Sequence, residues 1–206
     1  MFNNKRWDQG GRFYGGWWQR IINKEEIGED YRKSITINDQ PIYEPDWKGL
    51  HINMLYAKKK LPMPEGDVYW LDGYSNDYKF RKFVKRMLLV MVNADSPEKV
   101  RKALHAEVKW EKKLDLPEEI GSTSQKDIYP VIEAFRQKHA DIAEFFCSGA
   151  GIDLQFEESQ MAEQIMLHFA KRGIPCLPIH DSFIVESKYR DELVDMMKKS
   201  FRDKYD

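Results

Sequence analysis

The segment that most constrains the fold is IPCLPIHDSFIV, residues 174–185. Two short apolar runs flank His180-Asp181-Ser182, and Asp and Ser are frequent in the turns between paired strands. The segment therefore predicts an antiparallel hairpin over 174–187 whose tip carries an ionisable aspartate. That aspartate has two interpretations: it forms the turn, or it serves a reaction that needs a rigidly held carboxylate.

Helix and strand patterns alternate along the rest of the chain. Apolar residues recur at helical spacing, and turn-forming residues separate the periodic stretches. Helices are expected over 47–60, 77–94, 97–113, 126–146 and 155–172, the last ended by Gly173, and a final helix is expected with the stripe Tyr189, Leu193, Met197 and Phe201. Two short strands are expected around Asn38-Asp39-Gln40. This order predicts an α+β fold with an antiparallel sheet.

Composition limits the class of protein. A chain of 206 residues with 42% hydrophobic content suffices for one domain with a real core. The net charge of −1 excludes a globally cationic coat, so any nucleic-acid contact must come from local patches. Cys147 and Cys176, the only cysteines, build no disulfide framework or metal site. The N-terminus is polar rather than signal-like and no apolar run approaches the roughly 20 residues of a membrane span, so we expect a cytoplasmic protein.

A second aspartate, Asp46, ends the predicted strand QPIYEPD. Two aspartates at the ends of neighbouring strands can share divalent cations. Carboxylate oxygens suit Mg²⁺, which keeps waters and substrate phosphates as its other ligands. Asp46 and Asp181 are far apart in sequence, and sequence separation sets no distance in space. Their pairing is a hypothesis at this point.

The helix predicted over 77–94 is cationic in its first half. Arg81, Lys85 and Leu89 share one side of it, because they are spaced four residues apart. Arg86 flanks them. One interpretation is an ordinary solvated basic face. The other is an anion-binding face, since cations near the start of a helix oppose its dipole and a bound triphosphate would offset that cost.

The first twenty residues combine glycines, an arginine and several aromatic side chains. Gly10 and Gly11 allow close backbone approach, and Arg12 can donate two hydrogen bonds to a phosphate or a base edge. The aromatic side chains either stack on bases or belong to the core. They are Trp7, Phe13, Tyr14, Trp17 and Trp18.

Taken in order, four segments resemble the palm and fingers motifs of the family A polymerases. That superfamily joins DNA polymerase I-like enzymes with the single-subunit RNA polymerases of phages and mitochondria. DQGGR (8–12) resembles the DxxGR motif, EPDWKGLHINMLYA (44–57) motif A, RKFVKRMLLVMVNA (81–94) motif B and PIHDSFIV (178–185) motif C. The four motifs are distributed along nearly the whole chain. The Lys-Arg pair of motif B and the HDSF of motif C favour the RNA polymerase branch.

The resemblance implies a polymerase palm with a small antiparallel sheet and helical fingers, without a thumb. It implies a single domain over 1–206, with a fingers-like insertion at about 61–125. The implied activity is template-directed nucleotidyl transfer from nucleoside triphosphates by a two-metal mechanism, in DNA replication of a phage or mobile element. The implied ligands are Mg²⁺, with Mn²⁺ as a substitute, a primer-template and nucleoside triphosphates. An accessory protein would replace the thumb.

The resemblance also assigns roles to residues. Asp46 and Asp181 would hold the metal ions, and Lys85 would bind the triphosphate and protonate the departing pyrophosphate. The implied nucleotide-binding residues are Arg81, Lys85, His51, Leu89 and Asn93, and the implied nucleic-acid-binding residues are Gly11, Arg12 and His180.

Several positions depart from the family pattern. His51 stands where DNA polymerases carry a glutamate that excludes ribose, and Asn93-Ala94 stands where a Tyr-Gly pair monitors the sugar. Ser182 replaces a second acidic residue. The choice between ribonucleotides and deoxyribonucleotides therefore stays open. Because the family's thumb precedes DxxGR and only seven residues precede Asp8, we expect processive synthesis to need a partner, unless the chain is a fragment of a longer protein.

Two further interpretations of the chain remain. One is a catalytically inactive polymerase-like protein that only binds nucleic acid, which the departures at His51 and Asn93 favour. The other is an ordinary α+β scaffold in which the motif matches are coincidental.

Overall fold

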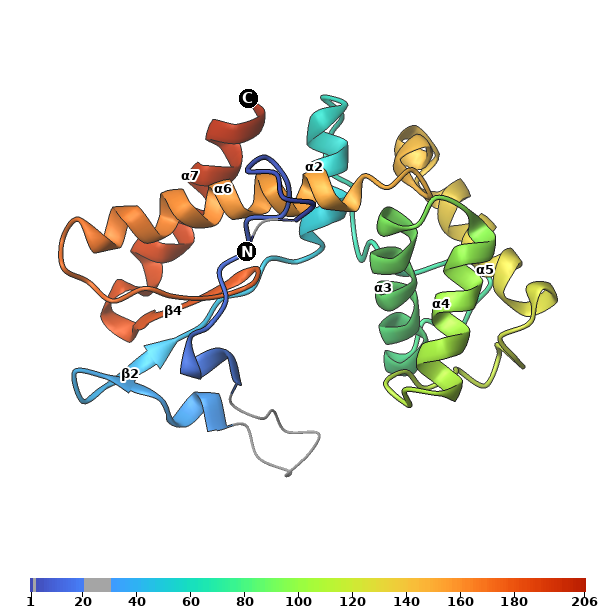
Figure 1. Cartoon of the computed structure of the whole chain (residues 1–206), viewed down its shortest axis with the longest axis horizontal. Coiled ribbons are helices and arrows are strands. Elements are labelled where there is room, and N and C mark those ends of the chain that lie inside the picture. The colour runs from blue at the N-terminus through green and yellow to red at the C-terminus, as the bar shows by residue number, and fades with distance from the viewer. Residues whose placement is uncertain (2, 21–30) are drawn as a thin grey trace. The chain divides into compact units, whose positions relative to one another are not determined.

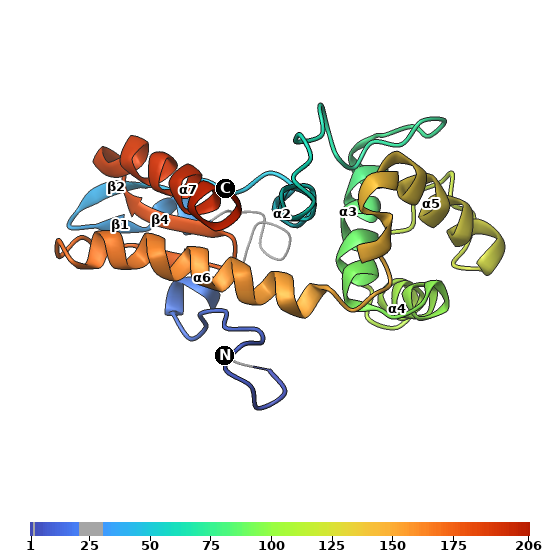
Figure 2. The ribbon, with the colours of Figure 1, turned by 90° about the horizontal axis from the view of Figure 1, so that it is seen from above.

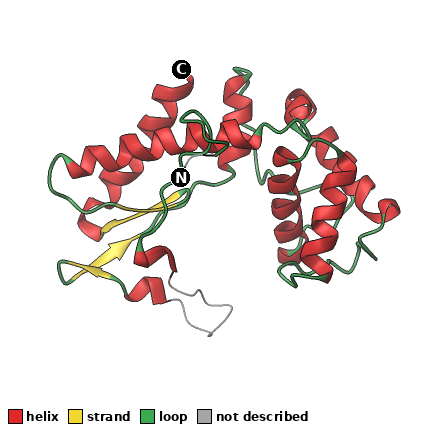
Figure 3. Cartoon of the chain, viewed as in Figure 1, coloured by secondary structure: helices red, strands yellow, loops and turns green. Residues whose placement is uncertain are grey.

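The structure is a computed structural model that describes residues 1, 3–20 and 31–206, and its chain forms two compact units. The first unit comprises Met1–Leu50 and Asp153–Asp206 and contains the sheet, whereas the second, His51–Ile152, is helical (Figure 3). The α+β class is confirmed. The insertion expected at about 61–125 falls inside the second unit, and the single-domain description stays a prediction. Nowhere in the described ranges is a helix both long and apolar enough to cross a membrane.

A four-stranded antiparallel sheet in the order β1-β2-β4-β3 forms the centre of the first unit. Its strands are β1 (Thr36–Ile37), β2 (Gln40–Tyr43), β3 (Leu177–Ile179) and β4 (Ser182–Glu186). Both predicted hairpins are confirmed, and β2 joins them by pairing with β4, with Ile42 opposite Glu186. Segments remote in sequence therefore lie side by side in the sheet (Figure 1).

Strand β4 is buried along its whole length, because both faces of the sheet are covered. On one face, Phe183 and Val185 pack against α6 (Gly151–Ala170) and α7 (Arg190–Tyr205). Figure 2 shows these two helices lying over the strands. On the other face, Ile184 packs with Trp18 and the short strands. Successive residues of β4 thus pack alternately into the apolar clusters on the two faces of the sheet. This explains why the apolar run Phe183-Ile184-Val185 is unbroken.

Helices α6 and α7 follow the predicted patterns closely. Helix α6 begins four residues earlier than expected and ends at Ala170, and Gly173 terminates the segment with a φ of 69°. That left-handed conformation favours glycine, which makes the stop readable from the sequence. In α7 the stripe buries Leu193 and Met197, as predicted.

The second unit packs three long helices around one apolar interior. They are α3 (Tyr78–Asn93), α4 (Pro97–Lys109) and α5 (Gln125–Lys138), with α2 (Leu50–Lys58) preceding them. The side chains of Asp77 and Ser96 cap the first turns of α3 and α4 by accepting hydrogen bonds from backbone N–H groups. The fully buried members of this core include Phe80, Phe83, Val84, Met87, Met91, Val100, Leu104, Ile128 and Phe135.

The single helix predicted over 126–146 is wrong. Helix α5 ends at Lys138, and a separate 3₁₀ helix, η3 (Ala140–Phe145), follows after His139. The buried ring of His139 lies 3.0 Å from the Tyr56 hydroxyl and 2.9 Å from the Val68 carbonyl oxygen. These two partners fix the ring where the backbone leaves helical geometry. Helix α4 likewise ends at Lys109, before the predicted 113.

Candidate functional site

The two predicted metal ligands belong to neighbouring strand ends of the first unit. The pairing of β2 with β4 resumes beyond Tyr43 as an isolated bridge between Asp46 and Ser182. Residues directly opposite in an antiparallel pair have Cα atoms roughly 4.5–5.5 Å apart. Asp181 is the next residue along from Ser182, in the β3–β4 turn. The fold therefore brings the backbones of Asp46 and Asp181 to the same end of the sheet. Sharing a metal ion further requires that their two carboxylates converge, and this stays a prediction.

The turn that holds Asp181 is formed by its neighbours. His180 adopts the left-handed φ of 52° that the turn needs. The Ser182 hydroxyl donates across the turn to the Ile179 carbonyl oxygen at 3.2 Å. The Asp181 side chain is half-buried, and no described residue forms a hydrogen bond or ion pair with its carboxylate. A purely turn-forming role for Asp181 is therefore poorly supported, because the turn does not use its carboxylate.

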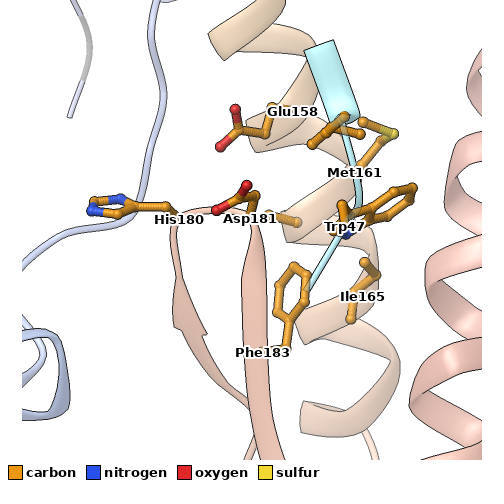
Figure 4. A pocket seen from close by; sticks show the side chains of 9 residues that line it. Trp47, Glu158, Met161, Ile165, His180, Asp181 and Phe183 are labelled. Carbon is orange, nitrogen blue, oxygen red and sulfur yellow. The ribbon is translucent and has the colours of Figure 1, made fainter. Parts of the chain in front are cut away.

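A small pocket lies beside Asp181 in the first unit. Trp47, Met161, Ile165 and Phe183 supply its apolar walls, and Asp181 and Glu158 supply two carboxylates. In Figure 4 both carboxylates point away from the Trp47 ring, and the imidazole of His180 extends out of the pocket. The pocket lining is mainly apolar, and of its two carboxylates that of Glu158 is already paired with Arg12.

Glu158 was not predicted from the sequence. Its side chain is only 4% exposed, and both its oxygens accept hydrogen bonds from Arg12, at 3.0 and 2.7 Å. Burial opposes the charge of Arg12, yet the hydrogen bonds and charge of Glu158 raise the pKa of the guanidinium. Arg12, which was predicted to bind a nucleic-acid strand, is thus held at the pocket by a buried carboxylate. The sequence feature that could have indicated Glu158 is its position on an amphipathic helix, four residues before the buried Ala162 and therefore on the same side.

Glu44 is a second carboxylate that the sequence did not indicate. Its Oε1 atom accepts a hydrogen bond from the Ser182 hydroxyl at 2.9 Å and lies 3.1 Å from the Arg32 guanidinium. Ser182 stands where the family pattern has a second acidic residue. The structure places the carboxylate of Glu44 directly against that serine.

The N-terminal loop is attached to the hairpin that carries Asp181. Gly10 and Gly11 have φ values of 81° and 85°, in the left-handed region, and the Gly11 N–H donates to the Met1 carbonyl oxygen at 2.7 Å. The Tyr14 ring meets the His180 ring edge-on, with centroids 5.4 Å apart. Trp18 is half-buried, which agrees with a core position, whereas Trp7, Tyr14 and Trp17 are exposed, and stacking on bases stays a prediction for them.

The basic helix α3, in the second unit, has two of its cations already paired. Arg81 lies 2.5 Å from an Asp67 carboxylate oxygen and 4.9 Å from the centre of the Tyr69 ring. Arg86 forms a bidentate pair with the buried carboxylate of Glu107. The hydrogen bonds of Glu107 raise the pKa of Arg86. These arginines stabilise the second unit, and each has one acidic partner while part of its side chain remains exposed.

The remaining predicted residues of the second unit differ in exposure. Lys85 is exposed on α3, and within the described part of the chain it has no ion-pair partner. Leu89 is half-buried and Asn93 is exposed on the same side of the helix, where Asn93 donates to the Leu89 carbonyl oxygen at 2.7 Å. His51 is only 9% exposed in the first turn of α2. Lys85 is therefore the accessible cation of the predicted set on this helix.

The predicted residues divide between the two units. Gly11, Arg12, Asp46, His180 and Asp181 belong to the first, whereas His51, Arg81, Lys85, Leu89 and Asn93 belong to the second. Across residues 1, 3–20 and 31–206, no three His, Cys, Asp or Glu side chains form a metal-ligand group. Comparison with protein-family models, with curated proteins and with solved structures found no match in any of the three.

Proposed function

We propose that this chain is a metal-dependent nucleotidyltransferase that extends a nucleic-acid strand on a template, built on a palm like that of the family A polymerases. Its first unit would be the palm, and its second unit the fingers. The proposed context is a phage or mobile element. The proposal names nucleoside triphosphates and a primer-template as substrates and leaves the sugar open.

One observation supports this proposal above all. The bridge between Asp46 and Ser182 brings the strand end of motif A beside the hairpin tip of motif C. A chance match of short motifs would give no reason for two segments so remote in sequence to pair at Asp46 and at the neighbour of Asp181. The hairpin turn also leaves the Asp181 carboxylate uncommitted.

The donor set fits Mg²⁺. Carboxylate oxygens are hard ligands, and Mg²⁺ is often bound through one or two carboxylates, with waters and substrate phosphates completing its coordination. Asp46 and Asp181 would hold the ions, so a cluster of three protein ligands is not required. When bound, the ions would activate the attacking 3′-hydroxyl and neutralise charge on the transferred phosphate.

Other residues of the chain would bind the substrates. Lys85, the accessible cation of α3, would attract the triphosphate and supply a proton to the departing pyrophosphate. Leu89 and Asn93 continue the same side of that helix and would contact the nucleoside. Arg12 is held in place by Glu158 and retains guanidinium N–H groups that can donate to a strand.

Primer extension tests the proposal directly. With a primer-template, Mg²⁺ and either ribonucleoside or deoxyribonucleoside triphosphates, the primer should lengthen, and Asp181→Ala should reduce extension to background. Asp195→Ala is the matched control, because Asp195 is an exposed aspartate of α7 in the same unit. Extension that survives Asp181→Ala would refute the metal assignment, and absence of extension with every triphosphate would refute the activity.

The second candidate function is a catalytically inactive polymerase-like protein that binds nucleic acid. The pairing of Arg81 with Asp67 and of Arg86 with Glu107 favours it, because these arginines are already neutralised. It predicts template binding that depends on neither Mg²⁺ nor an incoming nucleotide. Strand binding measured with EDTA and again with Mg²⁺ and triphosphates distinguishes the two functions.

A further inference from the structure

The first residues of the chain expose an unusual amount of aromatic surface. Of the ten large hydrophobic side chains exposed in the described ranges, five lie within residues 1–17. Trp17 is 62% exposed, Tyr14 53% and Phe13 37%. We call Phe13, Tyr14 and Trp17 the aromatic strip. Exposed apolar patches on small proteins usually mark a surface that binds something.

Hydrogen bonds attach the aromatic strip to the hairpin that carries Asp181. The Gln19 side-chain amide donates to the Phe13 carbonyl oxygen at 3.0 Å and to the Pro178 carbonyl oxygen at 2.8 Å. The Trp18 indole N–H also donates to Pro178, at 3.0 Å. Tyr14 packs edge-on against His180, the neighbour of Asp181. The strip is therefore fixed beside the candidate metal ligands rather than on an unattached tail.

The charge around the strip identifies the kind of ligand. Residues 1–20 carry four basic side chains, Lys5, Arg6, Arg12 and Arg20, against the single acid Asp8, although the whole chain has a net charge of −1. Arg6 is paired with Asp8 and Arg12 with Glu158, whereas Lys5 and Arg20 are exposed and can meet a phosphate. Aromatic rings that stack on bases, interleaved with cations that meet phosphates, are the usual composition of surfaces that bind single strands. An uncharged protein or acyl chain would gain nothing from these cations.

We propose that the aromatic strip is a stacking platform for unpaired bases of a single-stranded nucleic acid. Its position next to His180 would hold that strand beside Asp46 and Asp181. That this strand is the one being copied or extended rests on the proposed function. The binding itself requires neither metal nor nucleotide, and this makes the two separable by experiment.

The test measures binding of fluorescein-labelled oligothymidylate and oligouridylate of about 12 nucleotides, with a blunt duplex of the same length alongside. Fluorescence anisotropy is recorded at low salt in EDTA. Stacking on one aromatic ring is worth roughly five- to a hundredfold in affinity, so Tyr14→Ala with Trp17→Ala should weaken single-strand binding by about tenfold or more. Trp17→Phe should retain most of the affinity, because the ring is kept. Thermal melting verifies that each variant is folded.

Trp110→Ala is the matched control, because Trp110 is 71% exposed and lies in the second unit. It should leave oligonucleotide binding unchanged. Unchanged binding by the double variant would overturn the proposal, and so would an equal loss with Trp110→Ala. Conversion of a dimer into a monomer by the double variant, with oligonucleotide binding intact, would make the strip a protein interface and overturn it as well.

The two proposals fail in different ways. If no primer is ever extended but the double variant loses single-strand binding, the platform stands and the enzymatic function fails. If primers are extended and the double variant binds as tightly as the unaltered chain, the platform is refuted and the enzymatic function stands. Because oligothymidylate and oligouridylate differ in both the sugar and the base methyl group, a third oligonucleotide, oligodeoxyuridylate, is needed to show which sugar the platform prefers.

Discussion

Asp181 in the first unit and the arginines Arg81 and Arg86 in the second differ in how far the fold uses their charges. In the first unit, the turn around Asp181 is closed by its neighbours His180 and Ser182, and its carboxylate is left available. In the second, Arg81 and Arg86 are neutralised by Asp67 and Glu107. Segments that resemble polymerase motifs occur in both units. The difference shows that spacing locates charged residues but does not show which of them are engaged in holding the fold together.

The comparison also separates two kinds of cation. Arg12 and Arg86 each meet a buried glutamate, so removal of their partners would leave a charge with poor solvation. Lys85 has no such partner within the described residues and is exposed. Substitutions at these positions should therefore divide into effects on folding and effects on ligand binding.

The largest effect on folding is expected at Glu158. Glu158→Ala should lower the free energy of unfolding by about 3 kcal/mol, because it leaves Arg12 partly buried without its partner. Equilibrium unfolding in urea measures this change. Arg6→Ala removes the exposed pair with Asp8 in the same loop and should have no measurable effect. Equal stability of the two variants would contradict the structural role given to Glu158.

An intermediate effect is expected on α3. Lys85→Ala should weaken binding of a nucleoside triphosphate by about tenfold, since one exposed cation facing a phosphate contributes on the order of 1.5 kcal/mol, and should leave stability unchanged. Arg81→Ala should do the reverse: it should lower stability by up to about 1 kcal/mol through loss of the Asp67 pair. Isothermal titration with a triphosphate and urea unfolding give the two quantities. A loss of stability in Lys85→Ala, or a loss of triphosphate affinity that is larger in Arg81→Ala than in Lys85→Ala, would contradict these two roles.

The smallest effect is a pH dependence of the second unit. Burial lowers the pKa of His139, whose neutral ring donates to the Val68 carbonyl oxygen and accepts from the Tyr56 hydroxyl. The unfolded chain takes up a proton near the usual histidine pKa of about 6.5, whereas the folded ring resists it. Stability from this group is therefore present above that pH and is lost as the pH falls below it. Urea unfolding at descending pH measures it.

Replacement of His139 by Gln should remove that pH-dependent part while also lowering stability at neutral pH. His180→Gln is the control, because His180 is exposed in the first unit. A pH dependence that persists in His139→Gln would assign it to other groups.

Much of the fold was predictable because local residues determine it. The turns at Asn38-Asp39 and before Ser182, and the stop at Gly173, depend on residues adjacent in sequence. The break at His139 was not predictable, because its cause lies in hydrogen bonds to Tyr56 and Val68, 83 and 71 residues away. A helical pattern continues through such a position when only neighbours are considered.

The candidate site shows the same division. Asp46 and Asp181 were singled out because each lies next to a strand end, Asp46 shortly beyond β2 and Asp181 in the turn before β4, and strand ends are visible in the apolar pattern. Glu158 was missed because its partner, Arg12, is 146 residues away, and only the folded chain reveals the pair. Arg81 was predicted to bind nucleotide because its ion pair with Asp67 was not visible in the sequence. That pair depends on the conformation of the loop before α3, and the loop carries no periodic pattern.

The most direct measurement of the central claim is anomalous diffraction from crystals soaked in Mn²⁺. Mn²⁺ substitutes for Mg²⁺ at oxygen ligands and can be located by its anomalous scattering. The account predicts a peak between the carboxylates of Asp46 and Asp181, and its loss in crystals of Asp181→Asn. A fully soaked crystal with no peak at these two aspartates, or with an unchanged peak in the variant, would contradict it.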